Sequence, residues 1–419
     1  MQIGRNAAMT PISTTRLLWI AIVGMLLTAC ASPLPTLALS AEPATMGLHA
    51  AAVGRAALPA VEEITFQSGE FTIVGDLRTP AGSGSFPVVL FVHGSGPIDR
   101  TFSGYYLPIM ERMLQAGYAV FSWDKPGTGE STGQVDDTPR VLHSRAQIVL
   151  DAIEVMKERP DIDPRRIGLW GISQASYVMP LVLSQSEDVA FMICVSCGGL
   201  PGHDQAAYQI TSFAMFCAGF LDEDLDQRTV LLAELDEART FDSYEEYLHY
   251  REVLEAFVDL SPNRQKLLDV LSQAGASGAI PEKAWLENDP EIEGWWNPVE
   301  VLERVRIPVL AVFGDKDSNG DPIQGAYAWR KALEQAGNMD FQVELLPGVD
   351  HFMATSETGC LKNQEGTFDQ VLQEQGYGPL DESLALFQRE PGQHTPLSAW
   401  PFAPGYLDLI EKWLRGLPQ

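Results

Sequence analysis

The chain has 419 residues, of which 45% are hydrophobic and 20% are charged, and its formal net charge is −28 at pH 7. This is the composition of a globular protein, and the length favours a main domain with an insertion over one minimal domain. The strong negative charge argues against nucleic acid as a partner, and it makes anionic substrates less favourable.

The N-terminal segment predicts export from the cytoplasm. Arg5 and Arg16 precede the apolar run Leu17 to Leu27, which is followed by small residues. The run is too short for a comfortable membrane span, and basic residues before a short apolar run are typical of a cleavable signal. We therefore expect residues 1–29 to be a signal peptide, with an uncleaved anchor as the alternative.

The end of this segment, Leu27-Thr28-Ala29-Cys30, resembles the lipobox of bacterial lipoproteins, in which the cysteine is acylated and becomes the first mature residue. The resemblance implies lipidation of Cys30, with residues 30–60 as a lipidated tether between membrane and folded domain. Ser32 stands where an aspartate signals inner-membrane retention in that family. The resemblance thus implies an extracytoplasmic protein anchored to a bacterial membrane, the outer one in a Gram-negative cell. A plain signal peptide cleaved nearby is the alternative.

Strands and helices alternate along the rest of the chain. Alternating apolar residues from Val61 to Thr79, with Gly69 near the turn, predict an antiparallel hairpin. Continuous apolar runs that follow predict strands buried on both faces, as parallel sheets require. These runs are Pro87 to Val92, Tyr118 to Trp123, Ile167 to Trp170, Ala190 to Val195, Pro308 to Phe313 and Phe341 to Leu346. One apolar face from Val141 to Met156 predicts a helix ended by Pro160, and a last helix is expected from about Tyr406 to Leu414. The pattern predicts a doubly wound, mostly parallel α/β sheet.

The connection between the fourth and fifth of these runs is far longer than a normal crossover. Its middle is acidic and carries apolar residues at helical spacing. We therefore expect a helical cap at residues 200–300, inserted between two parts of the core at residues 61–199 and 301–419. A second irregular stretch, residues 355–404, is expected to cover the site or the sheet edge.

The segment IGLWGISQASY, residues 167–177, places Ser173 between an apolar strand and a helix. Asp163-Pro164 and Gly171 are expected to bound that strand. Gly171 lies two residues before the serine and Ala175 two after, so the segment departs by one methyl group from the G-x-S-x-G nucleophile elbow. Small residues at these positions permit a strained turn that exposes a nucleophile. An ordinary strand-to-helix turn is the alternative.

A serine hydroxyl is a weak nucleophile and needs a base, which a third group must hold. His351 follows the last predicted strand, so we expect it at the carboxyl edge of the sheet. Asp317, three residues past Gly314, is preferred as the acid. Asp315 is the alternative, and we expect it to cap or brace its loop instead.

Attack on an ester carbonyl creates an oxyanion, which backbone N–H groups must stabilise. Gln174, after the proposed nucleophile, would supply one such group. The segment His93 to Pro97 would supply the other, with Ser95 preferred and Gly94 and Gly96 as alternatives. A plain glycine turn is the other interpretation of this segment.

Three further segments match ligand motifs in part. Residues 124–131, DKPGTGES, lack the spacing of a phosphate-binding loop, so we expect a turn beside the site. Residues 315–320 match the first half of a calcium loop, but Ala326 stands where its glutamate belongs. Cys194 and Cys197 form a C-x-x-C without a second pair for zinc, and are expected to be core residues, with a disulfide possible. We therefore expect neither a metal nor a cofactor.

Taken together, five segments resemble the α/β-hydrolase superfamily, especially its bacterial serine esterases with HGSGP loops. They are His93 to Pro97, Trp123 to Ser131, Gly171 to Ala175, Gly314 to Asp317, and His351. The chain order of serine, acid and histidine is that of the family. We recognise no family in the cap sequence itself, so the resemblance does not extend to substrate specificity.

The resemblance implies a serine hydrolase that cleaves a small-molecule carboxylic ester through an acyl-enzyme. Ser173 would attack, His351 would move the proton, and Asp317 would hold the imidazole. The amides of Gln174 and Ser95 would bind the oxyanion. A peptidase or amidase similar to the prolyl oligopeptidases is one alternative, and a noncatalytic binding module on the same fold is another. The sequence leaves the oligomeric state open.

Overall fold

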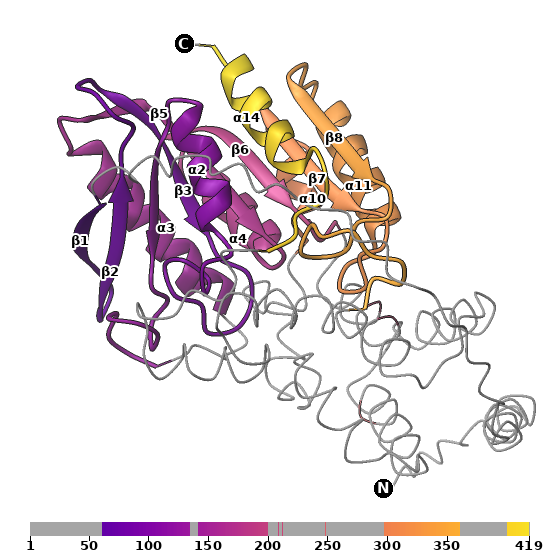
Figure 1. The fold of residues 1–419 in the computed structure, drawn as a ribbon, viewed down its shortest axis with the longest axis horizontal. Coiled ribbons are helices and arrows are strands. Elements are labelled where there is room, and N and C mark those ends of the chain that lie inside the picture. The colour runs from indigo at the N-terminus through magenta and orange to yellow at the C-terminus, as the bar shows by residue number, and fades with distance from the viewer. Residues whose placement is uncertain are drawn as a thin grey trace, which may run out of the picture. The chain divides into compact units, whose positions relative to one another are not determined.

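A computed structural model describes residues 61–134, 141–199, 297–360 and 400–418, together with Tyr208, Ser212 and Leu248. All of these residues lie in one compact unit, Ala57–Gln419 (Figure 1). The proposed signal peptide, its tether, and nearly all of the expected cap at residues 200–300 lie outside the described residues.

Eight strands and six helices make up the described part of the fold. The strands are β1 (Val61–Ser68), β2 (Phe71–Arg78), β3 (Phe86–Val92), β4 (Ala119–Trp123), β5 (Ile162–Ile172), β6 (Val189–Val195), β7 (Val309–Gly314) and β8 (Phe341–Leu346). The helices are α2 (Leu107–Gln115), α3 (Val141–Lys157), α4 (Ala175–Leu183), α10 (Val299–Leu302), α11 (Pro322–Gln335) and α14 (Tyr406–Gly416). None of these helices is both long and apolar enough to span a bilayer.

The strands form a single sheet in the order β1-β2-β4-β3-β5-β6-β7-β8. β1 and β2 are antiparallel to their neighbours, whereas β4, β3, β5, β6, β7 and β8 pair in parallel. The predicted doubly wound, mostly parallel sheet is therefore confirmed. Because β5 to β8 are adjacent and parallel, the loops that follow them leave the sheet at one edge.

Helices cover both faces of the sheet, so its central strands are buried on both sides. Along β3, Val88, Leu90 and Val92 pack in one hydrophobic cluster, while Val89 and Phe91 pack in the other. This alternation is the two-residue period of a strand, and it explains why the segment is apolar throughout. The first cluster includes side chains of α3, α4, α10 and α11, and the second includes those of α2 and α14. Figure 1 shows where these helices lie along the sheet.

The hairpin is confirmed, with Gly69 at a φ of 56° in its turn. Two other predictions were wrong in part. Asp163-Pro164 does not bound the fifth strand, because β5 continues back to Ile162, which pairs with Phe86 across a register shift. The last strand is not buried on both faces: in β8, the edge strand, only Val343 is buried and Leu345 is 40% exposed.

Candidate active site

Ser173 stands at a sharp turn between β5 and α4. Its φ is 59°, in the left-handed region that serine seldom adopts. The turn is held at both ends, because the backbone N–H of Ser173 donates to the carbonyl of Val195 (3.0 Å) and its carbonyl accepts from Ser176 N (2.9 Å). The side chain is partly exposed while its neighbours in β5 and α4 are buried. Strained backbone held by its surroundings is typical of a functional position.

The close approach of β5 and α4 accounts for the small residues on either side of Ser173. A Cβ added to Gly171 would lie 2.5 Å from the Cβ of Ala175 and 3.0 Å from the carbonyl oxygen of Val92. Gly171 must therefore remain a glycine. Ala175 is fully buried and its methyl group occupies the space that Gly171 leaves open, so the departure from the G-x-S-x-G pattern fits this turn.

Asp317 and His351 lie in direct contact on the loops that follow β7 and β8. His351 Nδ1 is 2.9 Å from Asp317 Oδ1 and 2.8 Å from Oδ2, and both side chains are buried. A carboxylate accepts hydrogen bonds, so the proton lies on Nδ1 and Nε2 is left as the basic nitrogen. The backbone N–H groups of Asn319 (2.8 Å) and Gly320 (2.9 Å) also donate to Asp317 Oδ1 and fix the carboxylate. Tyr208 donates its hydroxyl to the Asp317 carbonyl (3.0 Å).

The loops after β7 and β8 are packed tightly enough to hold this pair. A Cβ on Gly314 would lie 2.2 Å from the Val349 carbonyl oxygen. Asp315 Oδ1 accepts from the Gly348 N–H (2.6 Å), so Asp315 braces the turn before His351 and does not contact the imidazole. The backbone N–H of Lys316 donates to the Val349 carbonyl (2.9 Å).

Opposing influences act on the pKa of His351. Burial disfavours the imidazolium, but the negative charge of Asp317, its hydrogen bond to the ring, and the charge of Asp350 outweigh burial and raise the pKa above the ordinary 6.5. The same carboxylate would stabilise an imidazolium formed during a reaction.

Ser173 lies on the same edge of the sheet as this pair and is linked to it through the end of β6. Its N–H is bonded to the carbonyl of Val195, and the next residue, Ser196, donates its hydroxyl to the His351 carbonyl (2.6 Å). Among the described residues, no hydrogen bond joins Ser173 Oγ to the His351 ring. Such contacts commonly tighten only when substrate is bound. Ser196, which has a φ of 49°, had no signal in the sequence.

The segment proposed to bind the oxyanion lies against Ser173. A Cβ on Gly94 would lie 3.5 Å from Ser173 Cβ, whereas Ser95 and Gly96 are exposed.

His93 anchors the start of the segment. Its Nε2 donates to the Trp123 carbonyl (2.6 Å), and its Nδ1 accepts from the Tyr106 hydroxyl (3.1 Å). Burial and the nearby positive charges of Lys125 and Arg145 lower the pKa of His93 well below its ordinary value, so it is a neutral structural residue.

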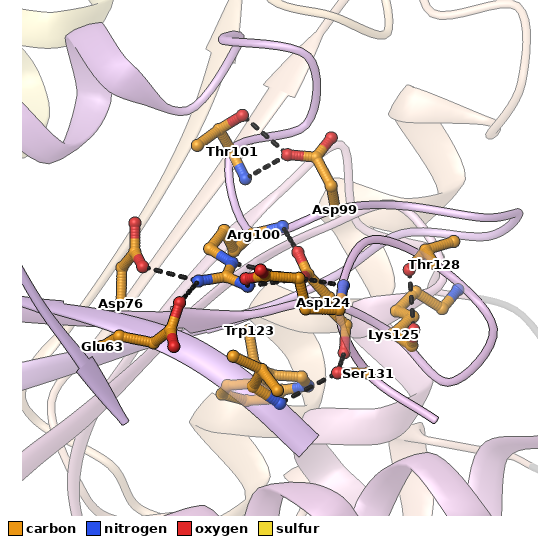
Figure 2. Close-up of polar contacts among 12 residues, drawn as sticks. Glu63, Asp76, Asp99, Arg100, Thr101, Trp123, Asp124, Lys125, Thr128 and Ser131 are labelled. Atoms are coloured by element: carbon orange, nitrogen blue, oxygen red, sulfur yellow. Dashed lines mark hydrogen bonds and ion pairs between the residues drawn. The ribbon is translucent and has the colours of Figure 1, made fainter. Parts of the chain in front are cut away.

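The DKPGTGES segment forms a turn beside this loop and is fastened by Arg100. The buried Asp124 carboxylate accepts from Arg100 Nη2 (2.7 Å) and from the N–H groups of Arg100 (2.8 Å) and Glu130 (2.9 Å). Arg100 also binds Asp76 (2.8 Å) and Glu63 (3.2 Å), which come from β2 and β1 (Figure 2). The guanidinium of Arg100 therefore links the antiparallel strands to the turn through ion pairs.

Cys194 and Cys197 are joined by a disulfide at the end of β6. Both are buried in the core, as expected, and the possible disulfide is present as well. Cys360 is also disulfide-bonded. No group of three or more metal-ligating side chains lies within the described ranges.

A family model for the alpha/beta hydrolase family matches residues 89–358. The chain belongs to this family. Esterase EstD of Thermotoga maritima is 24% identical over 306 residues, which are 71% of this chain and 62% of the relative. Hydrolase LUC6 of Fusarium is 31% identical over 143 residues, 33% of this chain and 32% of the relative. This α/β hydrolase thus spans less than two thirds of the length of these curated relatives.

Solved structures similar to this chain include two from Pyrococcus species. The Pyrococcus furiosus esterase Pf2001 has a TM-score of 0.46 at 13% identity, over 76% of this chain and 89% of that one. The acylaminoacyl peptidase of Pyrococcus horikoshii has a TM-score of 0.44 at 16% identity, over 70% of this chain and 38% of that one.

Proposed function

We propose that this α/β hydrolase is a serine esterase that cleaves small-molecule carboxylic esters through an acyl-enzyme. The observation that carries the proposal is the buried contact between His351 Nδ1 and Asp317, which leaves Nε2 basic on the sheet edge that Ser173 also occupies. The esterase among its relatives supports the same reaction class. An ester is the easier substrate for this chemistry, because its alkoxide leaves more readily than an amine.

In the proposed reaction, Ser173 Oγ attacks the ester carbonyl carbon while its proton passes to His351 Nε2. Asp317 keeps the Nδ1 proton in place and stabilises the imidazolium. The N–H groups of Gln174 and Ser95 bind the negative oxygen of the tetrahedral intermediate. The carbon–oxygen bond to the alcohol then breaks, and the alcohol takes the proton from Nε2. A water molecule attacks the acyl-enzyme by the same steps, which releases the acid and restores Ser173.

The proposal is tested by the hydrolysis of p-nitrophenyl esters of increasing acyl length, with matched anilides beside them. We expect ester turnover that Ser173→Ala lowers by at least about 10³-fold, since a triad acts as a unit. Ser184→Ala is the control, because this serine lies at the other end of α4 and donates to the carbonyl of Leu181 (2.7 Å). Equal rates for the Ser173→Ala and wild-type proteins would contradict the proposal, and faster anilide than ester turnover would favour the amidase alternative.

We further propose that Cys30 is lipidated and that the enzyme acts outside the cytoplasm on a bacterial membrane. The proposal rests on the Leu27-Thr28-Ala29-Cys30 segment and on the apolar run that leads into it. Cys30→Ser is expected to release the protein or leave it unprocessed, which membrane fractionation and intact mass would detect. Unchanged mass and fractionation would count against lipidation.

A further inference from the structure

We infer that Lys125 is a positioning residue for the proposed oxyanion site. Its ammonium group donates to the carbonyl oxygens of Gly94 (3.1 Å) and Gly96 (2.5 Å), in the loop beside Ser173. The side chain is buried, although lysine is seldom buried without a structural or functional reason. This inference rests on the proposed esterase function and assigns a part in it to the DKPGTGES segment.

Peptide geometry connects the two carbonyl contacts to the oxyanion. In a planar trans peptide, the C=O of one residue and the N–H of the next point in opposite directions. When Lys125 holds the Gly94 carbonyl, the N–H of Ser95 is directed away from the lysine. The same contact keeps the Gly94 carbonyl from turning toward the site, where its negative end would repel the oxyanion. Gly96, with a φ of 76°, can present its carbonyl to the same ammonium group.

A second buried cation holds the preceding peptide. Arg145, on α3, donates to the carbonyl of His93 and to the side-chain oxygen of Gln174. The N–H of Gly94 is thereby directed away from Arg145 by the same geometry. Arg145 thus joins the start of the oxyanion loop to the side chain of Gln174, the residue after Ser173. Two cations close to the loop add a positive field that favours an oxyanion.

Lys125 is itself held by the turn that contains it. Its backbone N–H donates to the carbonyl of Ile98 (3.1 Å), and the Thr128 hydroxyl donates to the same carbonyl (3.0 Å). The preceding Asp124 is fastened by Arg100 (Figure 2). Gly129 is required here, because a Cβ at its φ of 52° would lie 2.1 Å from Asp124 Oδ2. The turn therefore supplies a fixed base from which the lysine reaches the oxyanion loop.

The test compares Lys125→Met with the wild type and with Lys157→Met, a control at a lysine on α3 that pairs with Glu154 and Asp188. We measure kcat and KM for a p-nitrophenyl ester and the inhibition constant of a trifluoromethyl ketone, which forms an oxyanion on the nucleophile. For Lys125→Met we expect kcat to fall about 10²-fold with KM within about threefold, since a misplacement of about 1 Å has that effect. The inhibition constant should rise in parallel, whereas a purely structural role would leave inhibitor affinity unchanged in the folded fraction.

The outcomes separate the inference from the proposed function. A wild-type protein that hydrolyses no ester defeats the proposed function itself. An active wild type and a folded Lys125→Met variant with equal kcat and inhibition constant defeat only the role of Lys125. Should the methionine variant not fold, Lys125→Gln is used, because its amide can reach a single carbonyl without a charge. We expect a loss of kcat there too, and a folded glutamine variant with wild-type kcat overturns the inference.

Discussion

Replacing Asp317 with asparagine is expected to remove most of the activity by reversing the tautomer of His351. Asp317 Oδ1 accepts from the N–H groups of Asn319 and Gly320, and the carboxylate accepts from His351 Nδ1. An asparagine oxygen that keeps the two backbone contacts leaves its NH₂ group facing the ring. His351 must then accept at Nδ1 and carry its proton on Nε2, where it cannot take a proton from Ser173.

The size of the loss follows from the role of that tautomer. In serine protease triads the same change lowers kcat about 10⁴-fold with little change in geometry. At about 1.36 kcal/mol for each tenfold change, the activation free energy rises by about 5.4 kcal/mol. Substrate binding does not involve Asp317 directly, so we expect KM to change little.

Asp315→Asn is the matched control, two residues away on the same loop. Asp315 Oδ1 accepts from the Gly348 N–H (2.6 Å), and an asparagine oxygen can accept the same hydrogen bond. We expect its kcat to stay within about tenfold of wild type, since one hydrogen bond contributes about 1 kcal/mol. The assay is p-nitrophenyl ester hydrolysis with thermal unfolding of each variant. Equal, mild losses in both variants would refute the assignment of Asp317.

Three further predictions concern the base, the elbow and the Arg100 contacts. Because only neutral His351 can act as a base and its pKa is raised above 6.5, kcat/KM should fall with decreasing pH through a midpoint above that value; a midpoint below 6.5 would contradict the assignment. Gly171→Ala should lower the free energy of unfolding, measured in urea, by about 1–3 kcal/mol, because the added methyl group overpacks the turn. Adding Ala175→Gly should restore part of that stability. An unchanged free energy of unfolding in Gly171→Ala would refute the close approach of β5 and α4. Arg100→Leu should lower the free energy of unfolding, also measured in urea, by about 3–5 kcal/mol, because the buried Asp124 carboxylate loses its cation. A decrease of less than about 1 kcal/mol would show that the contact is dispensable.

Much of the sheet could be predicted because its central strands are buried on both faces and read as continuous apolar runs. The edge position of β8 could not, since an edge is defined by which strand lacks a neighbour, and that depends on the whole topology. The turn signal at Asp163-Pro164 misled because β5 continues through it across a register shift in its pairing with β3.

Those residues of the candidate site that follow a strand could be proposed from the sequence. Ser173, Asp317 and His351 all come after parallel strands, whose carboxyl ends share one edge. Lys125 and Arg145 were not assigned roles, because their partners lie 29 to 52 residues away in sequence and are set by tertiary packing. A signal for Arg145 did exist, since this charged residue falls among the apolar positions of α3.

The central claim is that Ser173 is the nucleophile, and fluorophosphonate labelling tests it most directly. Folded protein is treated with the probe, digested, and the modified peptide is mapped by mass spectrometry, with heat-unfolded protein and Asp317→Asn as controls. We predict a single phosphonylated site at Ser173 in folded protein, no labelling after unfolding, and much slower labelling of the Asp317→Asn variant. Labelling of another serine, or no labelling of Ser173 in protein that hydrolyses esters, would contradict the account.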